Sequence, residues 1–135
     1  MLFQLLRVDR CADDQRRLVY GPHAEVEALF ELPEGDLLER IAIAEFPGLG
    51  GSSRDRRSRL GDHWWDGHYK SIKETVCANE RIQKLLAADT DLIDVVTLSV
   101  PVVLVALPEL VSAISVTCAL IILFRMYGRG LCDAK

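Results

Sequence analysis

The chain has 135 residues, of which 50% are hydrophobic and 27% charged, and its formal net charge is −4. This length accommodates one domain, or one domain with an appendage. The net negative charge argues against general affinity for nucleic acid, so a nucleic-acid partner is not expected.

Residues 1–46 form a mixed N-terminal segment. Two short apolar stretches, residues 2–8 and 18–20, flank the polar sequence RCADDQRR. Short runs that end at turn residues such as Gly21–Pro22 are typical of a β-hairpin, and a short helix fits equally well. The apolar start is too short and too interrupted by charge to be a signal peptide.

Two helices are predicted in the rest of this segment. Residues 23–32 place apolar side chains at helical spacing. Asp36, followed by Glu39 three residues later, has the residue types of a capping box, and Pro47 ends the helix that it opens. The carboxylates here are interpreted as solvated helix faces, because no histidine or second motif supports a metal or acid–base site.

Residues 47–61, PGLGGSSRDRRSRLG, are predicted to form a flexible basic linker, because glycine and serine dominate the first half. The arginines could bind phosphate, although such runs are more often solvated loops. The sequence GLGGSS lacks the GK[ST] ending of a P-loop. The candidate phosphate contacts are Arg54, Arg56, Arg57 and Arg59.

Residues 62–135 are predicted to be helical, with Asp62 as the first cap. Trp65 belongs to the apolar face of the first helix in this region. Trp64 is expected at a rim or against a partner, because two neighbouring side chains cannot both point inward. A break is predicted near Ala78–Asn79, where the apolar face shifts.

Few residues have the spacing of a chemical site. His63 and His68 are five residues apart, which is the wrong angle for joint metal ligation on a helix. The cysteines at positions 11, 77, 118 and 132 form no CxxC or zinc-like cluster and are interpreted as reduced thiols of a cytoplasmic protein. No catalytic, cofactor-binding or metal site is predicted, and the chain is not expected to be an enzyme.

Residues 92–124 form a nearly continuous apolar run with only two formal charges. Pro108 followed by Glu109 is a helix-start signal, so the run is divided into two helices, 92–107 and 108–127. The first is expected to start at the cap Asp91 and could kink or break at a proline within it, and the second ends at a glycine.

The fold class predicted is mainly α, a small helical domain built on the apolar helix pair 92–127. A helix that is apolar all round is either deeply buried or in lipid. A domain of this size cannot cover two such helices alone, so a protein partner or self-association is expected. Insertion in an inner membrane through residues 92–124, which basic residues follow, is the alternative. The candidate interface or membrane residues are Trp64, Trp65, Val102, Val105, Leu110, Ile114, Ile121 and Phe124.

The C-terminal half resembles small, uncharacterised bacterial helical proteins. The features that match are KETVC at Lys73–Cys77, the acidic turn ADTD, the two apolar helices and the Gly-Leu-Cys ending at Gly130–Cys132. Some proteins of this kind look like accessory parts of bacterial conflict or defence systems. The resemblance and the missing catalytic pattern together favour a non-enzymatic accessory protein, with a small membrane-inserting effector as the alternative.

Overall fold

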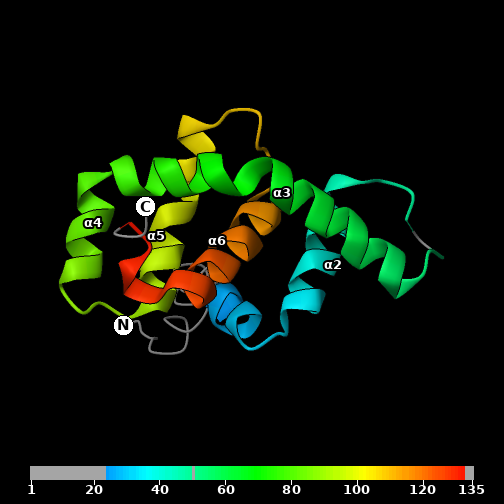
Figure 1. The fold of residues 1–135 in the computed structure, drawn as a ribbon, viewed down its shortest axis with the longest axis horizontal. Helices are drawn as coiled ribbons and strands as arrows, with labels where there is room; N and C mark the ends of the chain where they lie inside the picture. Colours follow the sequence, from blue (N-terminus) through cyan, green and yellow to red (C-terminus); the bar gives the residue numbers. More distant parts are fainter. Residues whose placement is uncertain (1–23, 50, 133–135) are drawn as a thin grey trace, which may run out of the picture.

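The computed structural model describes residues 24–49 and 51–132 (Figure 1). Every regular element in these residues is helical, which confirms the prediction of a small, mainly α domain. The alternatives for residues 1–22 lie outside the described part of the chain. The elements are a helical segment at residues 24–30, α2 (Glu34–Glu45), α3 (Arg54–Ala78), α4 (Glu80–Ala87), α5 (Leu92–Ala106), α6 (Ala113–Tyr127) and the short 3-10 helix η1 (Gly128–Gly130).

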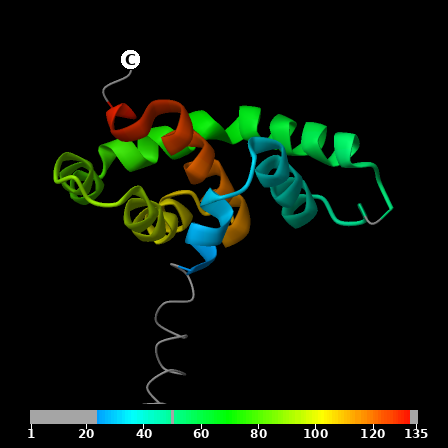
Figure 2. The same cartoon turned by 90° about the horizontal axis from the view of Figure 1, so that it is seen from below.

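Helix α6 is the centre of the fold. Ten successive residues, 115–124, are buried, which requires that other elements cover the helix on all sides. Helices α2, α3 and α5 all pack against α6, and Figures 1 and 2 show α6 running between them. The second helix of the predicted pair is therefore the core of this domain.

Helix α5 is buried on one side only. Val95, Val96 and Val103 lie in the core, whereas Leu98 and Val105 are exposed. Pro101 lies inside the helix, which continues to residue 106. The two members of the apolar pair therefore differ in burial, although their compositions are similar.

The connection between α5 and α6 corrects the predicted helix start at Pro108. Pro108 and Glu109 lie in a turn, which the backbone N–H of Leu110 closes by donating to the carbonyl of Leu107 at 2.9 Å. Proline suits the second position of such a turn as well as it suits the first turn of a helix. Leu107 has φ −121° and ψ 81°, outside the helical region, as expected for a residue before proline. Helix α6 begins five residues later, where the side chain of Ser112 caps it.

The predicted linker, residues 47–61, is wrong from Arg54 onward, because α3 begins there. The cap is Ser53, whose hydroxyl accepts a hydrogen bond from the backbone N–H of Arg56 at 3.1 Å, and not Asp62. Arginine is a good helix former, so the basic sequence extends the helix once a serine caps it. The loop between α2 and α3 is shorter than expected.

Trp64 and Trp65 are both buried, with exposed fractions of 7% and 8%, so the prediction of an exposed Trp64 is wrong. The buried positions Gly61, Trp64 and Trp65 follow the i, i+3, i+4 spacing of a wide apolar stripe. Helix α3 packs against α2, α5 and α6 at once, so more of its circumference is covered than contact with one helix would allow. The predicted break is confirmed, because Asn79 separates α3 from α4 and caps the second helix.

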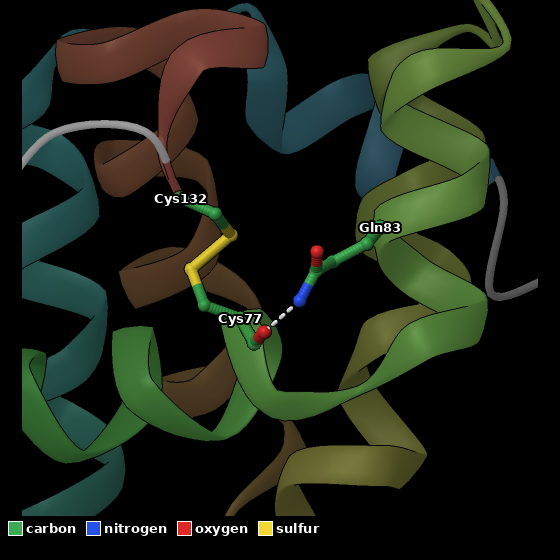
Figure 3. Close-up of a disulfide and its surroundings, with 3 residues drawn as sticks. All are labelled: Cys77, Gln83 and Cys132. Carbon is green, nitrogen blue, oxygen red and sulfur yellow. Dashed lines mark hydrogen bonds between the residues drawn. A yellow bond between two sulfur atoms is a disulfide. The ribbon is translucent and has the colours of Figure 1, made fainter.

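The interpretation of the cysteines as reduced thiols is wrong for Cys77 and Cys132, which form a disulfide across 55 residues. Figure 3 shows that this bond joins the last turn of α3 to the end of the described chain. Nearby, the side-chain amide of Gln83 donates a hydrogen bond to the carbonyl of Cys77. Cys118 is a buried free thiol in α6, and burial raises its pKa to about 12, although the nearby positive charge of Arg40 acts in the opposite direction.

Candidate interaction surface

The eight candidate interface residues divide into a buried and an exposed group. Five of the eight are buried, and three of these five belong to the apolar run. These buried side chains cannot contact a partner or lipid in this conformation. The other three lie at the ends of α5 and α6 that face each other. The buried residues are Trp64, Trp65, Leu110, Ile121 and Phe124; Val102 is half-buried, and Val105 and Ile114 are exposed.

The first exposed apolar feature is the segment of residues 105–111, VALPELV, which we call the tip; it comprises the last two residues of α5 and part of the loop that follows. Val105 and Val111 are 82% and 84% exposed, the highest values among the large apolar side chains of the described residues. Figure 1 shows this connection projecting beyond α3. Leu110 is 5% exposed and anchors the tip in the core. Isolated exposed valines are ordinary, but the tip carries two of them within seven residues on a projecting segment.

The tip carries one charge, the exposed Glu109. Within the described part of the chain, no side chain or backbone group forms an ion pair or hydrogen bond with this carboxylate. The sequence placed Glu109 at the start of a helix, where the helix dipole would stabilise it. In the structure it lies instead in the turn between α5 and α6, between the exposed Pro108 and the buried Leu110.

The second exposed feature is a depression of about 580 Å³, which we call the groove. It lies between α2, the start of α6 and the start of α3, and a smaller hollow of about 230 Å³ continues it along the helical segment at residues 24–30. Leu32, Arg40 and Ile114 line both, so the two form one surface. The remaining lining residues of the larger part are Asp36, Glu39, Ile43, Ala44 and Arg54.

Ion pairs neutralise most of the charges around the groove. Arg54 bonds to Asp36, and Nη2 of Arg57 lies 2.5 Å from Oε2 of Glu39. Arg40 is the exception: it makes no ion pair with any described residue. The groove therefore presents apolar side chains around one cation that no acid neutralises.

These ion pairs also place the four candidate phosphate contacts. Arg54 and Arg57 are paired with carboxylates of α2, whereas Arg56 and Arg59 are exposed in the first turns of α3. The four side chains do not converge on one point, since helical positions 54, 56, 57 and 59 lie on different faces. Two arginines of the basic sequence therefore bind α3 to α2 through ion pairs. These tertiary contacts could not be predicted from the spacing of the arginines in the sequence.

Two further findings bear on the kind of site. Among residues 24–49 and 51–132, no group of three His, Cys, Asp or Glu residues could hold a metal ion. The stretch Ala113–Gly130 is long and apolar enough to cross a bilayer by length and composition, and 56% of it is buried inside the domain. A central helix of a soluble bundle has the same composition as a membrane helix.

Sequence reasoning missed two contributors to this surface, Ile43 and Val111, which are 58% and 84% exposed. Ile43 lies two residues after Ile41, away from the buried face of α2, so its helical position could have indicated its exposure. Val111 lies inside the apolar run and does not stand out in the sequence. No family model, curated protein or solved structure matches the chain. The resemblance to small bacterial helical proteins therefore stays a prediction from the sequence.

Proposed function

We propose that the protein is a non-enzymatic interaction protein that binds another protein through the tip and the groove. The observation that carries this proposal is the exposure of Val105 and Val111 on a loop whose neighbour Leu110 is buried. A loop anchored in the core holds its apolar side chains in water at a cost that contact with a protein surface would remove. Accessory roles in bacterial conflict or defence systems fit such a protein and rest on the resemblance alone.

Membrane insertion is the second candidate, and the length and composition of Ala113–Gly130 favour it. Against it stands the position of this helix within the domain. Inserting α6 would expose the apolar faces of α2, α3 and α5, and it would break the 2.6 Å hydrogen bond from the Ser115 hydroxyl to the Glu45 carboxylate. Each of these changes costs free energy, which makes the interaction function the better supported of the two.

The location of the protein is part of the same proposal. The sequence predicts a cytoplasmic location because its cysteines are interpreted as reduced thiols. The Cys77–Cys132 disulfide removes this reason for the prediction. Disulfides persist mainly in oxidising compartments. We therefore propose that the protein acts where this bond stays oxidised, and alkylation of free thiols in intact cells before lysis would test it.

Fractionation and site-specific crosslinking test the proposed function. A photoreactive amino acid replaces Val111 in the tip, and Met126, which is 55% exposed at the other end of α6, serves as the matched control position. We expect the chain in the soluble fraction without detergent, with discrete protein adducts from position 111 and few from position 126. Sedimentation of the chain with membranes, or equal labelling from both positions, would overturn the proposal.

A further inference from the structure

We propose that the protein bound by this surface is a second copy of the same chain, with the tip of each copy seated in the groove of the other. This inference deepens the proposed function and rests on it. In the dimer, Glu109 of each copy pairs with Arg40 of its partner copy. The apolar residues around these two charges are then removed from water together.

Charge is the first reason. The tip carries one anion, Glu109, and of the two arginines that line the larger part of the groove Arg40 is the one without an ion pair. Neither Glu109 nor Arg40 forms an ion pair within the described chain. The two acids that line the larger part of the groove, Asp36 and Glu39, are already bonded to arginines of α3. A segment that brings one carboxylate next to Arg40 supplies the ion pair that this guanidinium lacks, and the single charge of the tip is a carboxylate. Glu25 lines the smaller hollow together with Arg40 but forms no ion pair with it.

The apolar surroundings of the two charges also match. On the tip, Val105 and Val111 stand on either side of Glu109 in the chain. In the groove, Leu32, Ile43 and Ile114 stand around Arg40. Docking would remove these apolar side chains from water, and the enclosed ion pair would gain strength from the lower local dielectric constant.

The position of the two surfaces on the fold favours a closed dimer. Val111 at the end of the tip and Ile114 in the groove are three residues apart, so both surfaces meet at the start of α6. A two-fold axis near this point lets each copy donate its tip and receive the other at once. Such an interface is isologous and closes on itself, so it produces dimers and not fibres.

A charge-reversal cycle measured by sedimentation equilibrium tests the pairing. The variants are Arg40→Glu, Glu109→Arg and the double variant, all at exposed positions, and circular dichroism verifies that each is folded. We expect the wild type to form dimers and each single reversal to weaken the dimer by at least about tenfold, as for close interfacial charge pairs. The double reversal restores the opposite charges, so it should return the dimer affinity to near that of the wild type.

Matched controls are Arg56→Glu and Glu74→Arg, which reverse exposed charges on α3 and should leave the dimer unchanged. A wild type that stays monomeric at every attainable concentration would overturn the dimer. Dimers that ignore both single reversals would show that another surface is used, and failure of the double variant to recover would overturn the Arg40–Glu109 pair.

The failure of this inference is distinguishable from the failure of the proposed function. A monomeric pure protein that still forms position-111 adducts with a different protein overturns only the second copy as occupant. A chain that sediments with membranes overturns the proposed function and this inference together. Dimers that depend on Arg40 and Glu109 support both.

Discussion

The close approach of α3 to α2 at Gly61 yields a prediction for two alanine substitutions. This glycine lies in α3 against the backbone of α2, and a β-carbon built on it would fall 1.9 Å from the carbonyl oxygen of Leu38 and 2.6 Å from its carbonyl carbon. Gly67 lies in the same helix with nothing within 4 Å of such a β-carbon. The same substitution at the two positions therefore separates helix propensity from interhelical packing.

The expected magnitudes have opposite signs. Gly67→Ala should raise the free energy of unfolding by about 0.8–1 kcal/mol, because alanine loses less backbone entropy than glycine in a helix. Gly61→Ala gains the same amount, but α2 would have to retreat by about 1.5 Å, the difference between 1.9 Å and an ordinary contact of 3.4 Å. The obstacle is backbone and cannot rotate away, so the upper end of overpacking costs, about 3 kcal/mol, leaves a net destabilisation of about 2 kcal/mol.

Urea denaturation followed by far-UV circular dichroism measures both variants. We expect the midpoint to rise for Gly67→Ala and to fall for Gly61→Ala, while the dependence on urea concentration stays the same. If Gly61→Ala were as stable as the wild type or more stable, the close crossing of α2 and α3 would be wrong.

Three further predictions concern stability. Replacing Cys77 and Cys132 with alanine should lower the free energy of unfolding by ~4 kcal/mol, the chain-entropy value for a loop of 55 residues, and thermal melts with and without reductant check it. Cys118 has its pKa raised by burial from 9.0 to about 12, so the unfolded state releases its proton first and stability should fall as pH rises from 9 towards 12. Cys118→Ala should lack this component, worth about 2 kcal/mol by pH 10.5, and an equal pH slope in both proteins would refute it. Arg57→Gln should cost about 1–2 kcal/mol through its half-buried bond to a carboxylate of α2, whereas Arg56→Gln should change the midpoint little; equal effects would contradict the ion-pair assignment.

The sequence by itself determined those features that depend on a few neighbouring residues. Asp91 caps α5 as predicted, and Asn79 marks the break between α3 and α4. Leu107 leaves the helical region because a proline follows it, and α6 ends at Gly128, whose φ of 59° favours glycine. Caps, prolines and glycines act within about one helical turn, which is why these four features were predicted correctly. The same signals were wrong at Asp36, Asp62 and Pro108, because α2, α3 and α6 begin instead at Glu34, Arg54 and Ala113.

Other features depended on contacts between distant residues. The basic residues after Ser53 are helical, and two of them, Arg54 and Arg57, bond to carboxylates of α2 that lie 18 residues earlier in the chain. Cys77 and Cys132 form a disulfide because the end of α3 lies beside residue 132 in the fold. The two cysteines are 55 residues apart, so no short sequence motif indicates the pair. Charge and cysteine patterns limit what these residues can do, but only proximity selects their partners.

The tertiary structure also decided which part of the apolar run is buried. Residues 115–124 are surrounded by three helices, whereas α5 is itself covered on one side only, and Val105 and Val111 remain in water. Composition gives the two helices nearly the same apolar character, and a helix without a polar face has no periodicity from which burial can be predicted. The groove has the same origin, since Arg40, Ile43 and Ile114 come together only because α2 packs against the start of α6.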